Sequence, residues 1–181
     1  MSKKWGTCHS ESKLTARIKR KLWGFDSFQG FPEPSVFDLS PRNPQKGEWC
    51  VDQTIVSHRL ETSGVNEKNF PGLETNIIKG FFDKILLVFP KNRCIAFLHI
   101  DADLYQSYKD VLAQFFSRVS IGGVVVFDEY REFPLSAEYG KGTIQKWPGC
   151  TKAVDDFFEN RPEKIQCDEL SKKYYVIKFA D

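Results

Sequence analysis

Two apolar runs in the second half of the chain each end abruptly in acidic residues. The segment 94–103 reads CIAFLHIDAD, and the segment 122–129 reads GGVVVFDE. A β-strand that stops in carboxylates places them at the carboxyl edge of its sheet, where open α/β folds bind ligands. Carboxylates gathered at one edge repel each other unless a cation lies among them, so the pattern predicts a cation site. The acids are Asp101, Asp103, Asp128 and Glu129.

The stretch between these two runs has the spacing of a helix. Its apolar residues recur at intervals of three and four, namely Leu104, Tyr108, Val111, Leu112, Phe115 and Phe116. The block therefore predicts a strand, a crossover helix and a second strand parallel to the first. An Asp after a strand is often only a helix cap. Two neighbouring strands that both end in acids favour a binding site instead.

The remainder of the chain alternates strand-like and helix-like segments, which indicates an α/β fold. We expect strands at 19–25, 75–80, near Ile165 and at 174–179, helices at 51–63 and 150–160, and a helix or turn at 81–89. The segments 35–47 and 131–148 are polar and are predicted to be loops.

The composition is that of one globular domain. The chain has 181 residues, 41% of them apolar and 14% aromatic, which is enough for a proper core, so we expect a single domain over 1–181. A formal net charge of +2 is too small to indicate nucleic acid as a partner. No run approaches about 18 consecutive apolar residues, and the start MSKK lacks the apolar core of a secretory signal. We therefore expect a soluble, cytoplasmic protein that has no membrane contact.

Asp26 follows the predicted strand at 19–25. Its position suggests a nucleotide site if this strand is the second of the sheet and the first lies before about residue 10. In nucleotide-binding α/β folds, a carboxylate at the end of the second strand accepts hydrogen bonds from the ribose hydroxyls. A glycine turn after the first strand lets the backbone approach the ligand. The glycine available for that turn is Gly6, and this signal is weak when taken alone.

Five segments, taken in order and spacing, resemble the macrocin O-methyltransferase family. They are 22–32 (LWGFDSFQGFP), 78–82 (IKGFF), 99–107 (HIDADLYQS), 122–130 (GGVVVFDEY) and 147–157 (WPGCTKAVDDF). The resemblance implies a Rossmann-like class I methyltransferase: a mostly parallel seven-stranded sheet with helices on both faces and an antiparallel C-terminal hairpin. It further implies an S-adenosyl-L-methionine-dependent O-methyltransferase that needs Mg²⁺ and acts on a hydroxyl of a sugar or glycosylated small molecule.

The resemblance also assigns roles to individual residues. The metal ligands of the family fall on Asp101, Asp128 and Glu129, and its general base falls on Asp103. The positions that bind the cofactor fall on Gly6, Asp26, Ser27, Gly80 and Asp101.

The chemistry of the residues supports such roles independently. An alcohol is a poor nucleophile until its proton leaves, and a bound divalent cation lowers the pKa of a coordinated hydroxyl. Mg²⁺ prefers hard oxygen ligands, and a further carboxylate beside it can take the proton. His99 is an alternative base, although its earlier place on the strand favours packing beneath the site. Tyr105 and Tyr130 are candidates either for the acceptor pocket or for the core.

The first loop departs from the family pattern Glu-x-Gly-x-x-x-Gly-x-Ser. Lys4 stands at the first position and Ser10 at the second glycine, while Gly6 and Ser12 are kept. A Cβ at Ser10 crowds the backbone approach, which weakens the prediction of cofactor binding. Family members also carry a lid segment ahead of this loop that helps pair subunits. We expect this domain to lack the lid. A homodimer is possible.

Two other functions compete with the methyltransferase. A shortened relative that keeps the fold as a binding or scaffold module is favoured by Lys4 and Ser10. A glycosyltransferase that holds a metal through D-x-D is favoured by Asp101 and Asp103, but it leaves the Asp128 and Glu129 pair unexplained.

Overall fold

The computed structural model describes residues 20–66, 68–132 and 145–180. The chain divides into two compact units. The described part of the smaller unit comprises 20–24, 52–66 and 68–78, and that of the larger unit comprises 25–51, 79–132 and 145–180. The prediction of a single domain over 1–181 stays a prediction.

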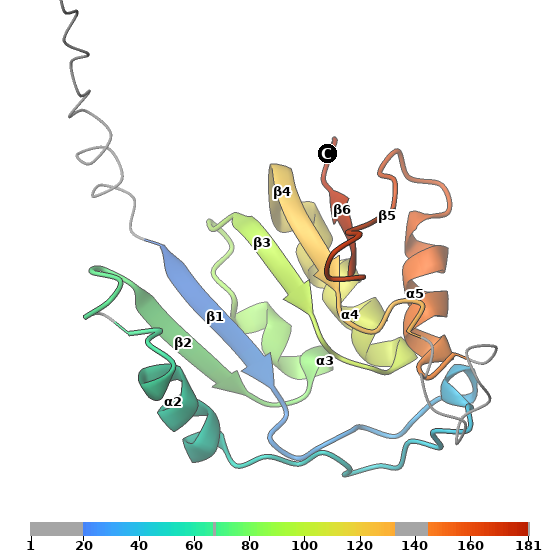
Figure 1. The fold of residues 1–181 in the computed structure, drawn as a ribbon, viewed down its shortest axis with the longest axis horizontal. Helices are drawn as coiled ribbons and strands as arrows, with labels where there is room; N and C mark the ends of the chain where they lie inside the picture. The colour runs from blue at the N-terminus through green and yellow to red at the C-terminus, as the bar shows by residue number, and fades with distance from the viewer. Residues whose placement is uncertain (1–19, 67, 133–144, 181) are drawn as a thin grey trace, which may run out of the picture. The chain divides into compact units, whose positions relative to one another are not determined.

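Strands and helices alternate along the described chain (Figure 1). The strands are β1 (Lys21–Asp26), β2 (Glu74–Lys79), β3 (Ile95–Ile100), β4 (Val119–Phe127), β5 (Gln166–Cys167) and β6 (Tyr174–Ile177). The α-helices are α2 (Gln53–Thr62), α3 (Phe82–Ile85), α4 (Tyr105–Phe115) and α5 (Pro148–Phe158). Three short 3-10 helices are η1 (Val36–Asp38), η2 (Leu86–Val88) and η3 (Phe116–Arg118).

The smaller unit holds α2 and most of β1 and β2, which pair in a two-stranded sheet. Figure 1 draws the two strands side by side and pointing the same way. An ion pair between Lys21 and Glu74 joins them near their beginnings. A Cβ at Gly24 would lie 2.8 Å from Cδ1 of Ile77, so a larger residue there would require the end of the Ile77 side chain to shift.

The larger unit holds a four-stranded sheet in the order β3-β4-β6-β5. β3 and β4 run parallel, with Ile100 opposite Phe127. β6 pairs antiparallel with both β4 and β5. The structure thus confirms the predicted parallel crossover unit and the antiparallel C-terminal hairpin.

The core of the larger unit lies where α4 packs against the sheet and against α5. All six apolar residues that predicted the crossover helix are buried: Leu104, Tyr108, Val111, Leu112, Phe115 and Phe116. Alternate residues of β4, among them Val125 and Phe127, are fully buried as well. Because side chains of a strand alternate between its faces, one face of β4 supplies this core. The acidic turn after β4 therefore follows a strand with a well-buried face, and the turn after β3 follows the buried Ile100.

The predicted element bounds differ from the structure mainly at the edges. The polar segment 35–47 contains η1, and the strand expected near Ile165 is only the two residues of β5. Six strands in two sheets are present in the described residues, whereas the resemblance implied seven strands in one.

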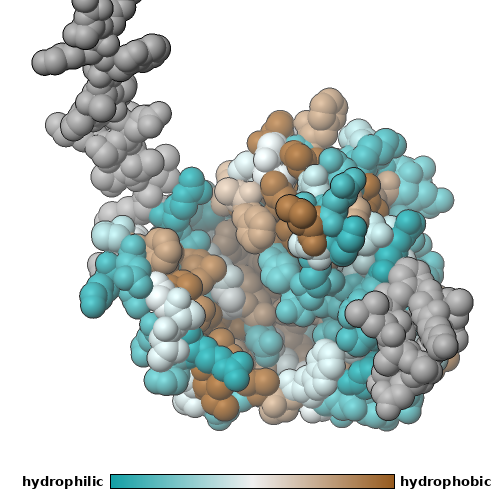
Figure 2. Space-filling model, in the orientation of Figure 1, coloured by the Kyte–Doolittle hydropathy of each residue, from teal (hydrophilic) through white to brown (hydrophobic). Residues whose placement is uncertain are grey.

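Apolar side chains remain exposed near the start of β4 and the end of β6 (Figure 2). Ile121, Ile177 and Phe179 are among them. None of the helices in the described ranges has the length and apolar character needed to cross a membrane.

Candidate functional site

The turn between β3 and α4 presents two carboxylates, Asp101 and Asp103, at the carboxyl end of the sheet. Asp103 has φ +57°, a left-handed conformation that Asp tolerates better than most residues do. The turn is tight, because Leu104 N donates to Ala102 O at 2.6 Å. α4 then begins at Tyr105, whose backbone N donates to the buried carboxylate of Asp38 at 2.8 Å.

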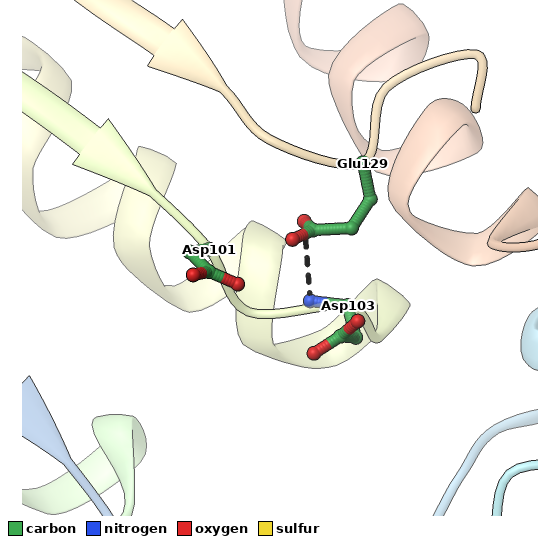
Figure 3. A group of neighbouring side chains, drawn as sticks. All are labelled: Asp101, Asp103 and Glu129. Atoms are coloured by element: carbon green, nitrogen blue, oxygen red, sulfur yellow. Dashed lines mark hydrogen bonds between the residues drawn. The ribbon is translucent and has the colours of Figure 1, made fainter.

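Three carboxylates converge at this turn: Asp101, Asp103 and Glu129 (Figure 3). One oxygen from each lies within 4.8 Å of the others. Asp101 is exposed, whereas Asp103 and Glu129 are only 7% and 3% exposed. Glu129 reaches from the turn after β4 and accepts a hydrogen bond from Asp103 N at 3.4 Å. The group offers hard oxygen ligands from two neighbouring strands, the donor set that suits a divalent cation such as Mg²⁺.

Burial and mutual repulsion raise the pKa of two of these carboxyls, Asp103 and Glu129. Burial, followed by the charge of Asp101, raises the pKa of Asp103 to about 7. Burial, followed by the hydrogen bond with Asp101 and the charge of Asp103, raises the pKa of Glu129 to about 9. Clustered acids hold protons in this way when no cation neutralises them.

Tyr108, on α4, holds the side chain of Glu129 in position. Its hydroxyl lies 2.5 Å from Glu129 Oε2 and 2.9 Å from Ile100 O. A phenol has one proton to donate, so a protonated Glu129 can donate to Tyr108 while Tyr108 donates to Ile100. This chain of hydrogen bonds joins the end of β3 to the turn after β4.

Asp128 does not join the group. Its Oδ2 lies 2.9 Å from Lys173 Nζ, and its Oδ1 lies 3.2 Å from His99 Nε2. Although burial raises the pKa of Asp128, hydrogen bonds from Lys173 and His99 outweigh it and lower the pKa overall. Asp128 and Glu129 lie in the bend after β4, and their carboxylates contact different partners. The role of Asp128 as a metal ligand stays a prediction.

The expectation that His99 packs beneath the site is wrong. Its side chain is 46% exposed, and its ring nitrogen pairs with Asp128. His99 lies on β3, and its side chain contacts Asp128 instead of packing into the core. Tyr130 is buried and donates to Asp155 at 2.6 Å, which favours a core role. The ring of Tyr105 packs on Phe37 at 4.5 Å.

A cavity of about 800 Å³ within the larger unit brings the other predicted residues together. Its walls include Asp26, Ser27, Gly80, Asp101 and Asp103. Gly6, Lys4 and Ser10 lie outside the described residues.

Backbone hydrogen bonds hold Asp26 in position at the wall of this cavity. Gly80 N donates to Asp26 O at 2.8 Å, which draws the ends of β1 and β2 together. Gly80 has φ +146°, and a Cβ there would overlap Ile85, so only glycine fits. Phe28 N donates to Asp26 Oδ1 at 2.6 Å and orients the carboxylate.

Sequence reasoning missed two features of the site. One is Asp38, which caps α4 and lies so close to Gly149 that a Cβ there would overlap its carboxylate. The other is the aromatic wall of the cavity formed by Phe31 and Trp49. Neither had a local signal, because their partners lie far away in the sequence.

The comparisons with known proteins agree with this architecture. The family model described as macrocin-O-methyltransferase (TylF) matches residues 10–167. Demethyldecarbamoylnovobiocin O-methyltransferase of Streptomyces niveus is 28% identical over 154 residues, which cover 82% of this chain and 52% of the relative. Mycinamicin III 3''-O-methyltransferase of Micromonospora griseorubida is 32% identical over 117 residues, covering 61% and 44%. The chain thus spans about half the length of these relatives.

Solved structures show the same fold. The O-methyltransferase NovP superposes with a TM-score of 0.67 at 20% identity, covering 93% of this chain and 64% of that one. The calicheamicin methyltransferase CalS11 superposes with a TM-score of 0.65 at 24% identity, covering 87% and 60%. The predicted class I methyltransferase fold is therefore confirmed. With a family model that matches most of its length, the chain belongs to the macrocin-O-methyltransferase (TylF) family.

Proposed function

We propose that this chain is an S-adenosyl-L-methionine-dependent O-methyltransferase that acts on a hydroxyl of a sugar or glycosylated small molecule. The observation that carries the proposal is that one cavity joins Asp26, Ser27 and Gly80 to the carboxylates Asp101 and Asp103. The first three would bind the nucleoside of the cofactor, and the last two would serve an acceptor hydroxyl. The relatives named above are O-methyltransferases, which supports this class of reaction.

Asp26 would bind the cofactor ribose. Its carboxylate is oriented by Phe28 N, and its backbone oxygen is held by Gly80 N. A carboxylate in this position can accept hydrogen bonds from both ribose hydroxyls. The cofactor supplies a methyl group on a positively charged sulfur.

Asp103 would be the general base. Without a metal, burial and the charge of Asp101 raise the pKa of Asp103 to about 7. A cation on Asp101 would lower this pKa, which would keep Asp103 as a carboxylate that can accept a proton at neutral pH. The O–CH₃ bond forms as the S–CH₃ bond breaks, and the electron pair of that bond stays on sulfur. The hydroxyl proton passes to the Asp103 carboxylate.

Asp101 and Glu129 would hold Mg²⁺, and Asp128 would join them after its side chain leaves Lys173. The bound ion would lower the pKa of the acceptor hydroxyl. Burial of Glu129 and its contact with Tyr108 fix one ligand in advance. Asp101 and Glu129 fit a hard divalent cation, because their oxygens already converge with those of Asp103.

The proposal is tested by calorimetric titration of the chain with S-adenosylmethionine, with and without Mg²⁺. We expect binding to the wild type and a loss of at least about tenfold in affinity for Asp26→Ala, since two charge-assisted hydrogen bonds are removed. Asp156→Asn is the control, because it removes the same charge from an exposed pair with Lys152. No binding by the wild type would favour the scaffold module suggested by Lys4 and Ser10.

A further inference from the structure

Two segments are fastened to each other directly after the Asp26 loop. Phe31 N donates to Glu48 O at 2.9 Å, and Gly47 N donates to Phe31 O at 3.0 Å. Gly30 has φ +75°, and a Cβ there would overlap the carbonyls of Gly47 and Glu48. We call this pair of segments, 28–31 and 47–50, the clasp. It fixes the backbone on either side of Trp49.

The clasp holds Trp49 in an unusual conformation. Its φ is +59°, a left-handed value that is uncommon for a bulky residue and persists only where the surroundings impose it. The ring centroid lies 5.3 Å from that of Phe31 and 5.4 Å from that of Trp147. Trp147 is 2% exposed, whereas Trp49 remains 55% exposed. A well-supported aromatic ring therefore keeps much of its surface open.

This open ring lines the same cavity as Asp103. The Arg42 guanidinium lies over both tryptophans, 5.0 Å from the ring of Trp49 and 5.4 Å from that of Trp147. It is also held by Glu48 Oε2 at 3.1 Å.

The rim beside Trp49 carries groups that can recognise hydroxyls. Glu33 and Lys46 line the cavity, and their charged ends lie 4.0 Å apart. A carboxylate and an ammonium together offer both acceptors and donors. An aromatic face flanked by such groups suits a ligand with one apolar C–H face and several hydroxyls, because C–H groups are drawn to the negative face of the ring. A pyranose has this form.

We infer that Trp49 is the platform on which the C–H face of a pyranose acceptor stacks, with the reacting hydroxyl directed at Asp103. This inference rests on the proposed methyltransferase function and names the acceptor subsite of the same cavity. Trp49 would contact the acceptor, and it would make no contact with the cofactor bound at Asp26 and Gly80.

The test is saturation-transfer NMR on the full chain with methyl α-L-rhamnopyranoside as the probe, combined with calorimetric titration of S-adenosylmethionine. The variants are Trp49→Ala and Trp49→Phe. Phe37→Ala serves as the control, because Phe37 is an exposed aromatic that does not line the cavity. Circular dichroism checks that each variant is folded.

We expect the ring-facing C–H protons of the sugar to receive the strongest saturation in the wild type. Trp49→Ala should weaken sugar binding about tenfold, the loss typical of a stacked aromatic, while Trp49→Phe loses less. The affinity for S-adenosylmethionine should stay the same in all three variants.

The inference is overturned if the wild type shows no transfer to the sugar, or if Trp49→Ala leaves the transfer unchanged. It is also overturned if Trp49→Ala weakens S-adenosylmethionine binding instead, because Trp49 would then stack on the adenine. Failure of the wild type to bind S-adenosylmethionine would count against the proposed function alone, since the sugar signal is measured without the cofactor.

Discussion

The turns that follow β3 and β4 both carry two acids, but they arrange them differently. After β3, Asp101 and Asp103 are two residues apart, and an oxygen of each belongs to the converging group. After β4, the acids are adjacent, so Glu129 enters the group while Asp128 turns to Lys173 and His99. The first turn thus contributes both of its acids to the converging group. The second holds one acid in place and keeps the other in an ion pair.

The largest expected effect comes from the first turn. Asp103→Asn should lower kcat by about 10²–10⁴, the usual contribution of a general base. S-adenosylmethionine binding should be kept, because Asp26 is untouched. A methylation assay with a deoxysugar acceptor measures the effect, and Asp156→Asn is the control. Full activity of Asp103→Asn would remove Asp103 from the role of base.

The next effect concerns the support of that turn. Asp38→Ala leaves the backbone N–H groups of Tyr105 and Ser35 without their acceptor. We expect a loss of about 1–3 kcal/mol in the free energy of unfolding, the cost of an unsatisfied buried donor. Ser35→Ala should cost less, because the Asp38 carboxylate and its bond to Tyr105 remain. Urea unfolding measures both, and equal losses would contradict the anchoring role of Asp38.

The second turn is tested by freeing its ion pair. If Asp128 leaves Lys173 to bind the metal, Lys173→Gln should tighten Mg²⁺ binding by up to about tenfold, because a competing charged hydrogen bond is removed. Asp128→Asn should weaken Mg²⁺ binding, and in that background Lys173→Gln should have no further effect. Calorimetry of the four proteins gives the coupling. Equal effects of Lys173→Gln in both backgrounds would show that Asp128 is not a ligand.

A further effect concerns stability as a function of pH. Folding raises the pKa of Asp103 from 3.8 to about 7 and that of Glu129 from 4.5 to about 9. The folded chain therefore holds protons that the unfolded chain has released, so without metal the stability should fall as pH rises from about 4 to about 9. Glu129→Gln should flatten the upper part of this fall. Urea unfolding in EDTA at several pH values measures it, and stability that rises over this range would contradict the assignment.

The contrast between the two turns also marks what the sequence could reveal. The strand–helix–strand block was predictable because its signals are local: the apolar spacing from Leu104 to Phe116 and the acids that end each strand. The position of Asp26 at the end of β1 was predictable for the same reason.

Other parts of the site depend on contacts between distant residues. Lys173 reaches Asp128 from the C-terminal hairpin, and Asp38 reaches Tyr105 from a segment that looked like an irregular loop. Trp49 becomes part of the cavity only because the clasp folds it against Phe31. Such contacts follow from tertiary packing, which neither periodicity nor residue type encodes along the chain.

The position of a bound divalent cation tests the central claim most directly. Mn²⁺ has the same preference for oxygen ligands as Mg²⁺, and its anomalous diffraction locates it in a crystal. We predict a single strong peak in contact with the carboxylates of Asp101 and Glu129, facing the cavity beside Asp103. A crystal soaked in Mn²⁺ that shows these carboxylates unchanged, with no peak among them, would contradict the account.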